Sequence, residues 1–281
     1  KIGNKKEKIY QNWLLIIKSV LYILITFFLV NIFAKKKIIK NSKITLIDTF
    51  VDHRAGKYDT IYPNLQNILN KRNFKHVFFV PTFIINRNLL NTLNKIKSYS
   101  KSNYIFKEHF ISLSDIFRSL VRCFKINKFC KNYKNFQGLD CSMILINEIK
   151  SKNDLFNEIV ARLNFIFVKN LKKTRINVKK SINRFENQSV DRGWNLGFRT
   201  FFPEAKVLGY QGYLYYPQLN NQTPVFYEEK AKIIPNSLIT TSKFFKKPRR
   251  EFYKKLKIII GPSVEKQSIF KNIKFKYNYK F

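Results

Sequence analysis

The stretch that decides the fold is residues 184–213, RFENQSVDRGWNLGFRTFFPEAKVLGYQGY. It begins at the end of a predicted strand at 179–184, carries apolar side chains at helical spacing over 190–202, and returns to a short apolar run at 205–209. We therefore predict a strand, a helix and a second strand. This is the repeating unit of parallel α/β sheets.

The same alternation of strands and helices continues on both sides of this unit. Short apolar runs predict strands, and longer periodic runs between them predict helices. The predicted strands are 43–50, 76–80 (ended by Pro81), 104–107, 237–241 and 257–260, and the predicted helices are 64–72, 87–98, 113–129 and 141–173.

These elements predict an α/β protein with two lobes. Residues 41–140 form the expected N-terminal lobe, 141–177 a long connecting helix, and 178–281 the start of a C-terminal lobe. The chain begins at Lys1 without an initiator Met and stops within a basic aromatic run. We therefore expect a fragment whose second lobe is truncated.

Residues 1–40 are expected to form a basic, hydrophobic, membrane-associated helix. The run Trp13–Ala34 is 22 residues long, is interrupted by the single charge of Lys18, and has lysines on both sides. About 20 apolar residues suffice to cross a bilayer. Lysines at both ends fit a helix lying on anionic headgroups better than one that spans the membrane. An in-plane, a spanning and a buried core helix all remain open.

The formal net charge of +37 has two readings. Clustered Lys and Arg attract nucleic acids and anionic membranes. Here the charge is scattered, is mostly Lys, and accompanies abundant Asn, Ile, Phe and Tyr, as codon usage in an AT-rich genome would produce. We expect no nucleic-acid partner. The cysteines (Cys123, Cys130, Cys141) are expected in the core, and histidine spacing predicts no metal site.

Glycines are concentrated in the deciding stretch. The chain has eight, and Gly193, Gly197, Gly209 and Gly212 lie within 20 residues. Glycine serves where the backbone turns with positive φ or approaches another group closely. The cluster predicts a tight site, with helix–strand packing and ordinary turns as the alternative. No dinucleotide or P-loop fingerprint is present.

Carboxylates at predicted strand ends are the candidate catalytic groups. Ligands of open parallel sheets bind outside the carboxyl ends of the strands. That rule selects Asp48, Glu108 and Glu186, in a chain with only 17 acidic residues. A carboxylate there can accept a proton from an attacking hydroxyl. A helix-capping or salt-bridge role is the alternative for each.

The motifs of 184–213 resemble those of bacterial surface-carbohydrate biosynthesis proteins with a glycosyltransferase-B-like architecture. The resemblance covers about residues 43–265 and is most specific in Glu186-Asn187-Gln188, Gly193-Trp194-Asn195, Gly197-Phe198-Arg199 and 206–212. Related capsule and teichoic-acid polymer transferases carry a Gln-His-Gly turn. Here Tyr210-Gln211-Gly212 stands in its place, and no His follows Gln211.

The resemblance implies two Rossmann-like lobes with a cleft between them. It also implies metal-independent transfer of a sugar from a nucleotide-activated donor to a lipid-linked or glycan acceptor. It implies no cofactor besides the donor and a location at the cytoplasmic face of the bacterial inner membrane, on an anionic surface. A non-catalytic assembly protein of the same pathway and, less favoured, a basic membrane-bound nucleic-acid binder are the alternatives. The implied donor or substrate contacts are Asn187, Gln188, Gly193, Trp194, Arg199, Tyr210, Gln211, Gly212 and Gly261.

Overall fold

The structure is a computed structural model. It describes residues 3–37, 39, 43–51, 62, 65–72, 74–84, 88–130, 135–136, 138–140, 155–212, 222–251 and 253–263. Residues 141–154, the first part of the predicted helix 141–173, therefore lie outside the described residues.

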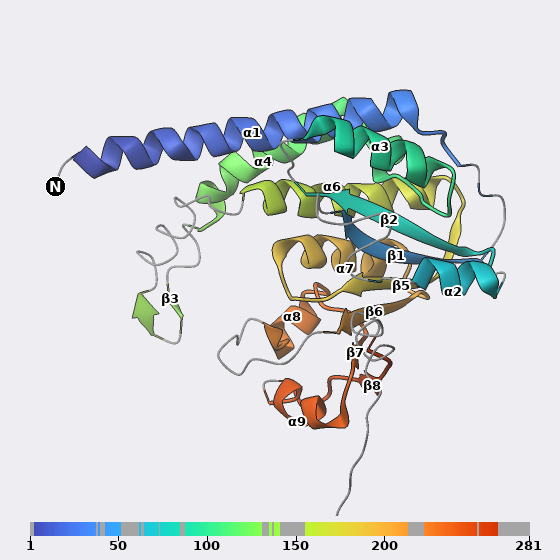
Figure 1. Cartoon of the computed structure of the whole chain (residues 1–281). Helices are drawn as coiled ribbons and strands as arrows, with labels where there is room; N and C mark the ends of the chain where they lie inside the picture. Colours follow the sequence, from blue (N-terminus) through green and yellow to red (C-terminus); the bar gives the residue numbers. More distant parts are fainter. Residues whose placement is uncertain are drawn as a thin grey trace, which may run out of the picture.

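One six-stranded parallel sheet organises the described residues (Figure 1). Its strand order is β2-β1-β5-β6-β7-β8. A parallel bridge from Phe79 to Tyr104 adds one further position beyond β2. The strands are β1 (Lys43–Val51), β2 (Val77–Phe83), β5 (Asn177–Arg184), β6 (Lys206–Gln211), β7 (Ser237–Thr240) and β8 (Ile258–Ile260).

With the bridge at Tyr104 counted, the order in space is that of the doubly wound Rossmann sheet. The chain adds β2 and then Tyr104 on one side of β1, and afterwards returns to add β5 on the other side. The topological switch point therefore lies between β1 and β5. The α/β class with a parallel sheet is as predicted.

The predicted division into two lobes differs from what is seen. Strands from both expected lobes pair within one sheet, since Ile47 of β1 lies opposite Ile182 of β5. A strand–helix alternation has the same sequence pattern whether the next strand joins the old sheet or begins a new one. Only the pairing of β5 with β1 distinguishes the two.

Two predicted strands differ in detail from the observed elements. The run 104–107 is a single bridge followed by the short helix η1 (Lys107–Phe110). The second strand does not end at Pro81, and β2 pairs with β1 through Phe83. The Phe79 amide points away from β1, toward Asn103, and Pro81 shares that orientation. The missing N–H of Pro81 thus faces the sheet edge, where proline is tolerated.

Helices cover both faces of the sheet and form its core. On one face α4 (Leu113–Cys130), α6 (Leu155–Lys173) and α7 (Ser189–Phe201) pack on residues such as Leu46 and Val207. On the other, α3 (Leu89–Ser100) packs on residues such as Ile47. The remaining elements are α2 (Leu65–Lys71), α8 (Phe226–Lys230), η3 (Lys243–Phe245), α9 (Lys246–Arg249), and a hairpin of β3 (Asn135–Phe136) and β4 (Leu139–Asp140).

The N-terminal helix α1 (Gly3–Phe33) lies lengthwise along the α/β core (Figure 1). Its Ile16–Phe33 window has a mean hydropathy of 2.2 and is apolar enough to cross a membrane, and a third of it is buried. The buried side chains include Ile16, Tyr22, Ile23 and Val30, which belong to the core clusters. These buried side chains lie on one face of the helix.

Helices α6 and α7 are in close contact through two glycines. A methyl group added at Gly193 would lie 1.9 Å from the carbonyl oxygen of Ala161, and one at Gly197 would lie 2.9 Å from Cβ of Val168. The backbones approach too closely for a side chain between them. These glycines therefore serve helix packing.

Gly193→Ala should destabilise the fold by at least about 2 kcal/mol, because the methyl group meets backbone that has to move. Gly197→Ala should cost less, since it meets a side chain. At an uncrowded helix position the same change would stabilise by up to about 1 kcal/mol. Urea unfolding would measure the effect. The control Thr200→Ala, on the exposed face of α7, should change stability by less than about 0.5 kcal/mol, and a stabilised Gly193→Ala variant would contradict the close contact.

Candidate functional site

Asp48 lies on β1, the strand at the switch point, and is fully buried. Burial raises its pKa from an ordinary 3.8 to about 6. The positive charge of Lys107, the Thr82 hydroxyl and the Thr49 amide act in the opposite direction. No described group forms a well-aligned hydrogen bond to either carboxylate oxygen. Asp48 is thus a carboxyl group that titrates near neutral pH.

Lys107 connects Asp48 to the elements around it. Its ammonium group donates to Oγ1 of Thr82 at 2.7 Å and to Oδ1 of Asn164 at 2.8 Å. Asn164, on α6, donates onward to the carbonyl oxygen of Val190 in the first turn of α7, at 3.3 Å. Burial lowers the pKa of Lys107, whereas the charges of Glu108 and Asp48 raise it. The lysine therefore joins β2, η1, α6 and α7 at one point.

Glu108 is the second buried carboxyl group of the cluster. It is 7% exposed, and burial raises its pKa to about 7 against the opposing charge of Lys107. A cavity of about 30 Å³ touches Lys107 and Glu108 and is lined on its other side by α1, including Tyr22 and Thr26. Glu108 and Asp48 thus both interact through their charge with the same lysine, although they are 60 positions apart in the sequence.

Asp191, in the first turn of α7, is the third buried carboxyl group of the cluster. Its Oδ2 accepts the backbone N–H groups of Glu186 at 2.8 Å and Gln188 at 3.1 Å. These bonds favour the charged form, yet burial and the charges of Asp48 and Glu186 raise its pKa to about 8. The influence of Asp48 shows that the β1 carboxyl group and the start of α7 share one environment.

Asn183 of β5 completes the polar layer. It follows Ile182, the partner of Ile47, and so lies beside Asp48 across the switch point. It is fully buried, and its amide atoms have no hydrogen-bond partner among the described residues. Unsatisfied buried polar groups are uncommon in folded proteins and need an explanation such as a ligand or water.

These groups, Asp48, Lys107, Glu108, Asn164, Asn183 and Asp191, form what we call the switch-point cluster. Carboxyl groups with pKa values near neutral can exchange protons with a substrate hydroxyl at physiological pH. Titratable groups shifted by burial and by specific charges are typical of functional sites. General acid–base work is therefore the chemistry to which the cluster is suited.

Glu186, the third predicted catalytic residue, lies at the margin of the cluster. Its side chain pairs with Arg184 at 2.9 Å, accepts a hydrogen bond from the Gln188 amide at 2.8 Å, and is 30% exposed. Both Glu186 and Gln188 thus contribute to the start of α7, where their backbone amides bind Asp191. A capping and salt-bridge role accounts for these contacts.

Several predicted donor contacts connect elements of the fold. Asn187, in the left-handed conformation (φ 58°), donates to both carboxylate oxygens of Glu228 at 3.0 and 3.1 Å. Arg199 forms a bidentate pair with Glu229 at 2.8 Å. Trp194 is fully buried and donates to Ser181 at 2.7 Å. These side chains attach α7 to α8 and to the sheet.

The remaining predicted contacts lie at the ends of β6 and β8. The Tyr210 hydroxyl donates to the carbonyl oxygen of Pro262 at 3.1 Å, and a side chain at Gly212 would collide with the Tyr210 ring. Gln211 is fully buried, donates to the Gln222 carbonyl at 3.1 Å and accepts from Arg249. The Gly261 amide donates to Thr240. Apart from Gln211, the structure keeps this set away from the face that carries Asp48.

Sequence reasoning missed four members of the cluster: Lys107, Asn164, Asn183 and Asp191. Asp191 carried a signal, because a carboxylate three residues after a helix N-cap is typical of a capping box. Lys107 precedes Glu108, but one lysine among so many is not distinctive. Asn164 and Asn183 could not be identified without knowing which face of their helix or strand points into the core.

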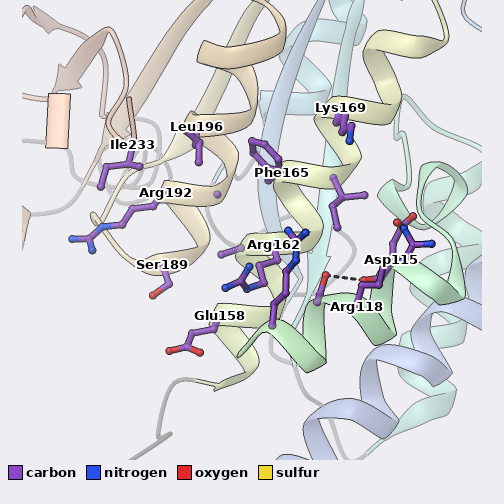
Figure 2. A pocket seen from close by; sticks show the side chains of 15 residues that line it. Asp115, Arg118, Glu158, Arg162, Phe165, Lys169, Ser189, Arg192, Leu196 and Ile233 are labelled. Atoms are coloured by element: carbon purple, nitrogen blue, oxygen red, sulfur yellow. Dashed lines mark hydrogen bonds between the residues drawn. The ribbon is translucent and has the colours of Figure 1, made fainter. Parts of the chain in front are cut away.

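A separate groove runs along the outer side of α6, with α4 and α7 as its walls (Figure 2). Its volume is about 550 Å³. Asn164 faces the cluster from one side of α6, whereas Arg162 and Phe165 face the groove from the other. Gly193 lines this groove as well as contacting Ala161. The groove and the cluster are thus distinct sites.

No group of three or more His, Cys, Asp or Glu side chains in the described part of the chain is arranged to hold a metal ion. Comparison with protein-family models, curated proteins and solved structures finds no match to this chain. Function therefore has to be argued from the site itself.

Replacing Asp48 by Asn should change how stability depends on pH. Between pH 4 and pH 7 the unfolded chain loses its Asp48 proton before the folded protein does, so the free energy of unfolding falls as pH rises. The loss amounts to about 3 kcal/mol once both states are ionised. Asp48→Asn should therefore gain up to about 3 kcal/mol over the parent protein between pH 4 and pH 8.

Denaturant unfolding of both proteins at pH 4 and at pH 8 would measure this difference. Glu251→Gln, which makes the same chemical change on an exposed side chain, is the matched control and should shift by less than about 0.5 kcal/mol. An Asp48→Asn difference that stays constant with pH would contradict the raised pKa.

Proposed function

We propose that this chain is a glycosyltransferase-like enzyme of bacterial surface polysaccharide biosynthesis. It would transfer a sugar from a nucleotide-activated donor to a lipid-linked or glycan acceptor without a metal ion. The observation that carries the proposal is Asp48, a buried carboxyl group with a pKa of about 6 on the strand at the switch point of a Rossmann-type sheet. Ligands of such sheets bind at that point.

In the proposed reaction, Asp48 or Glu108 takes the proton of the acceptor hydroxyl. The oxygen forms a bond to the anomeric carbon of the donor, and the nucleoside diphosphate leaves with the electron pair of the broken bond. Lys107 lies beside both carboxyl groups and offsets their negative charge. The N-terminus of α7 suits the leaving phosphates, because helix N-termini stabilise anions.

A glycosyltransferase-B-like enzyme has two lobes facing a cleft. Apart from the short β3–β4 hairpin, the described strands form one parallel sheet, and we assign them to a single Rossmann-like lobe. The motifs of 184–213 support the family assignment, and most of their side chains hold α7 in place around the cluster.

The same proposal places the chain on the cytoplasmic face of the inner membrane, with α1 in the membrane plane. One face of α1 packs on the protein, while Leu14, Ile17, Leu21, Phe28 and Ile32 recur at helical spacing on the other and are 47–68% exposed. A helix whose buried side chains from Ile16 to Val30 pack on the protein core is not free to cross a bilayer end-on. Lys18, Lys35 and Lys36 are exposed beside this stripe and suit anionic headgroups.

A non-catalytic assembly protein of the same pathway is the second candidate. It is favoured by the burial of the cluster, since Asp48 is fully covered and α1 lies against the cavity beside Glu108. An enzyme would have to expose these carboxyl groups to its substrates. A binding protein would not.

Transfer assays with a panel of nucleotide sugars and membrane lipid extract distinguish the enzyme from the non-catalytic assembly protein. For the enzyme, Asp48→Asn should lower kcat by at least about 100-fold, because a general base contributes that much. Donor affinity by calorimetry should be unchanged. Glu186→Gln, at the margin, should change kcat by only a few-fold. Donor binding without transfer by the parent protein would favour the assembly role, and absence of donor binding would contradict the enzyme.

The membrane contact has its own test in sedimentation with anionic vesicles. The double variant Leu21→Ser/Ile32→Ser removes two exposed apolar side chains, each worth about 1 kcal/mol or more when buried in lipid. Vesicle affinity should fall at least about tenfold. Phe244→Ser, at a 78% exposed position far along the chain, is the matched control. Equal binding by all three proteins would exclude the α1 stripe as the contact.

A further inference from the structure

The groove between α4, α6 and α7 combines two kinds of surface. Its floor is apolar and includes Ala161, Phe165, Ile166, Leu196 and Ile233. Its rim is cationic, with Arg118, Arg122, Arg162, Lys169 and Arg192 against the carboxylates of Asp115 and Glu158. Figure 2 shows Arg118 on the wall formed by α4 and Arg162 on α6.

Most of the rim cations are uncompensated within the described residues. Arg192 pairs with Glu228 at 2.8 Å. Arg118, Arg122, Arg162 and Lys169 form no ion pair with a described carboxylate. Arginine beside an apolar surface favours a ligand that carries a phosphate and a hydrocarbon portion, because the guanidinium group binds phosphate in a bidentate manner.

The position of the groove identifies the source of that ligand. On α4, Leu113, Phe117 and Val121 form an exposed apolar stripe of 38–53% exposure, one side of which borders Arg118 and Arg122. The buried sides of α4 and α1 share one core cluster, to which Ile116 and Ile23 belong. Because Arg118 and Arg122 border the exposed stripe of α4, a membrane that engages this stripe would bring its headgroups to the two arginines.

We propose that this groove binds the phosphate headgroup of an anionic membrane lipid. Arg118, Arg122 and Arg162 hold the phosphate, and a hydrocarbon chain lies along Phe165 and the apolar floor. A volume of about 550 Å³ accommodates a headgroup with part of a chain. The site is accessory to the switch-point cluster, from which α6 separates it. This inference rests on the proposed membrane contact of α1 and not on sugar transfer.

The test uses the full chain and dihexanoyl phosphatidic acid at a concentration where it is monomeric, so that it requires no bilayer. Titration calorimetry should show binding. The double variant Arg118→Gln/Arg162→Gln should weaken it at least about tenfold, the loss expected for two charge-assisted contacts. Lys230→Gln/Lys254→Gln removes two exposed charges outside the groove and should leave the affinity within about twofold.

Three results would overturn the proposal. The first is no binding of the monomeric lipid by the parent protein. The second is an equal loss of lipid affinity in Arg118→Gln/Arg162→Gln and in Lys230→Gln/Lys254→Gln. The third is an affinity for inorganic phosphate equal to that for the lipid. A different outcome would identify a nucleic-acid site instead. In that case the parent protein would bind a single-stranded oligonucleotide at concentrations where the lipid does not bind, and Arg118→Gln/Arg162→Gln would lose this binding. Vesicle sedimentation of Leu21→Ser/Ile32→Ser reports on α1 separately, so failure of the membrane contact and failure of the groove are distinguishable.

Discussion

The structure depends on the burial of one cation, Lys107. An ammonium group in the protein interior is costly unless it is hydrogen-bonded and paired. Its partners come from β2, from α6 and, through their charge, from Asp48 and Glu108. The position of α6 over the sheet, the burial of the two carboxyl groups and the approach of α7 to α6 are therefore parts of one arrangement. Loss of the cation would leave the buried carboxyl groups without a counter-charge.

The close contact of α6 and α7 makes this arrangement possible. Gly193 and Gly197 allow the two helix backbones to approach, which brings Asn164 within reach of the Val190 carbonyl and sets the first turn of α7 beside Asp48. The same contact leaves the outer side of α6 recessed between α4 and α7. The glycines thus determine both the buried cluster and the external groove.

The helix α1 connects the chemistry to the proposed location. It covers the small cavity beside Glu108 with Tyr22 and Thr26 and presents an apolar stripe on its opposite face. A membrane that engages the stripe would act on the same helix that covers the carboxyl groups. The basic surface, the interfacial helix and the buried acid–base cluster are then compatible with one enzyme that works on substrates at a lipid surface.

The sequence by itself determined the α/β class and most strand positions, because hydrophobic periodicity is local. It also selected Asp48 and Glu108, but Asp48 lies inside β1 and Glu108 lies in η1 and not at the end of a strand. Only the tertiary structure decided that one sheet contains the strands of both expected lobes. It also decided that Lys107, Asn164 and Asp191 meet at Asp48, and that Gly193, Trp194 and Arg199 hold helices together. These facts depend on which strand pairs with β1 and which helix face turns inward, and such long-range choices leave no local pattern in the chain.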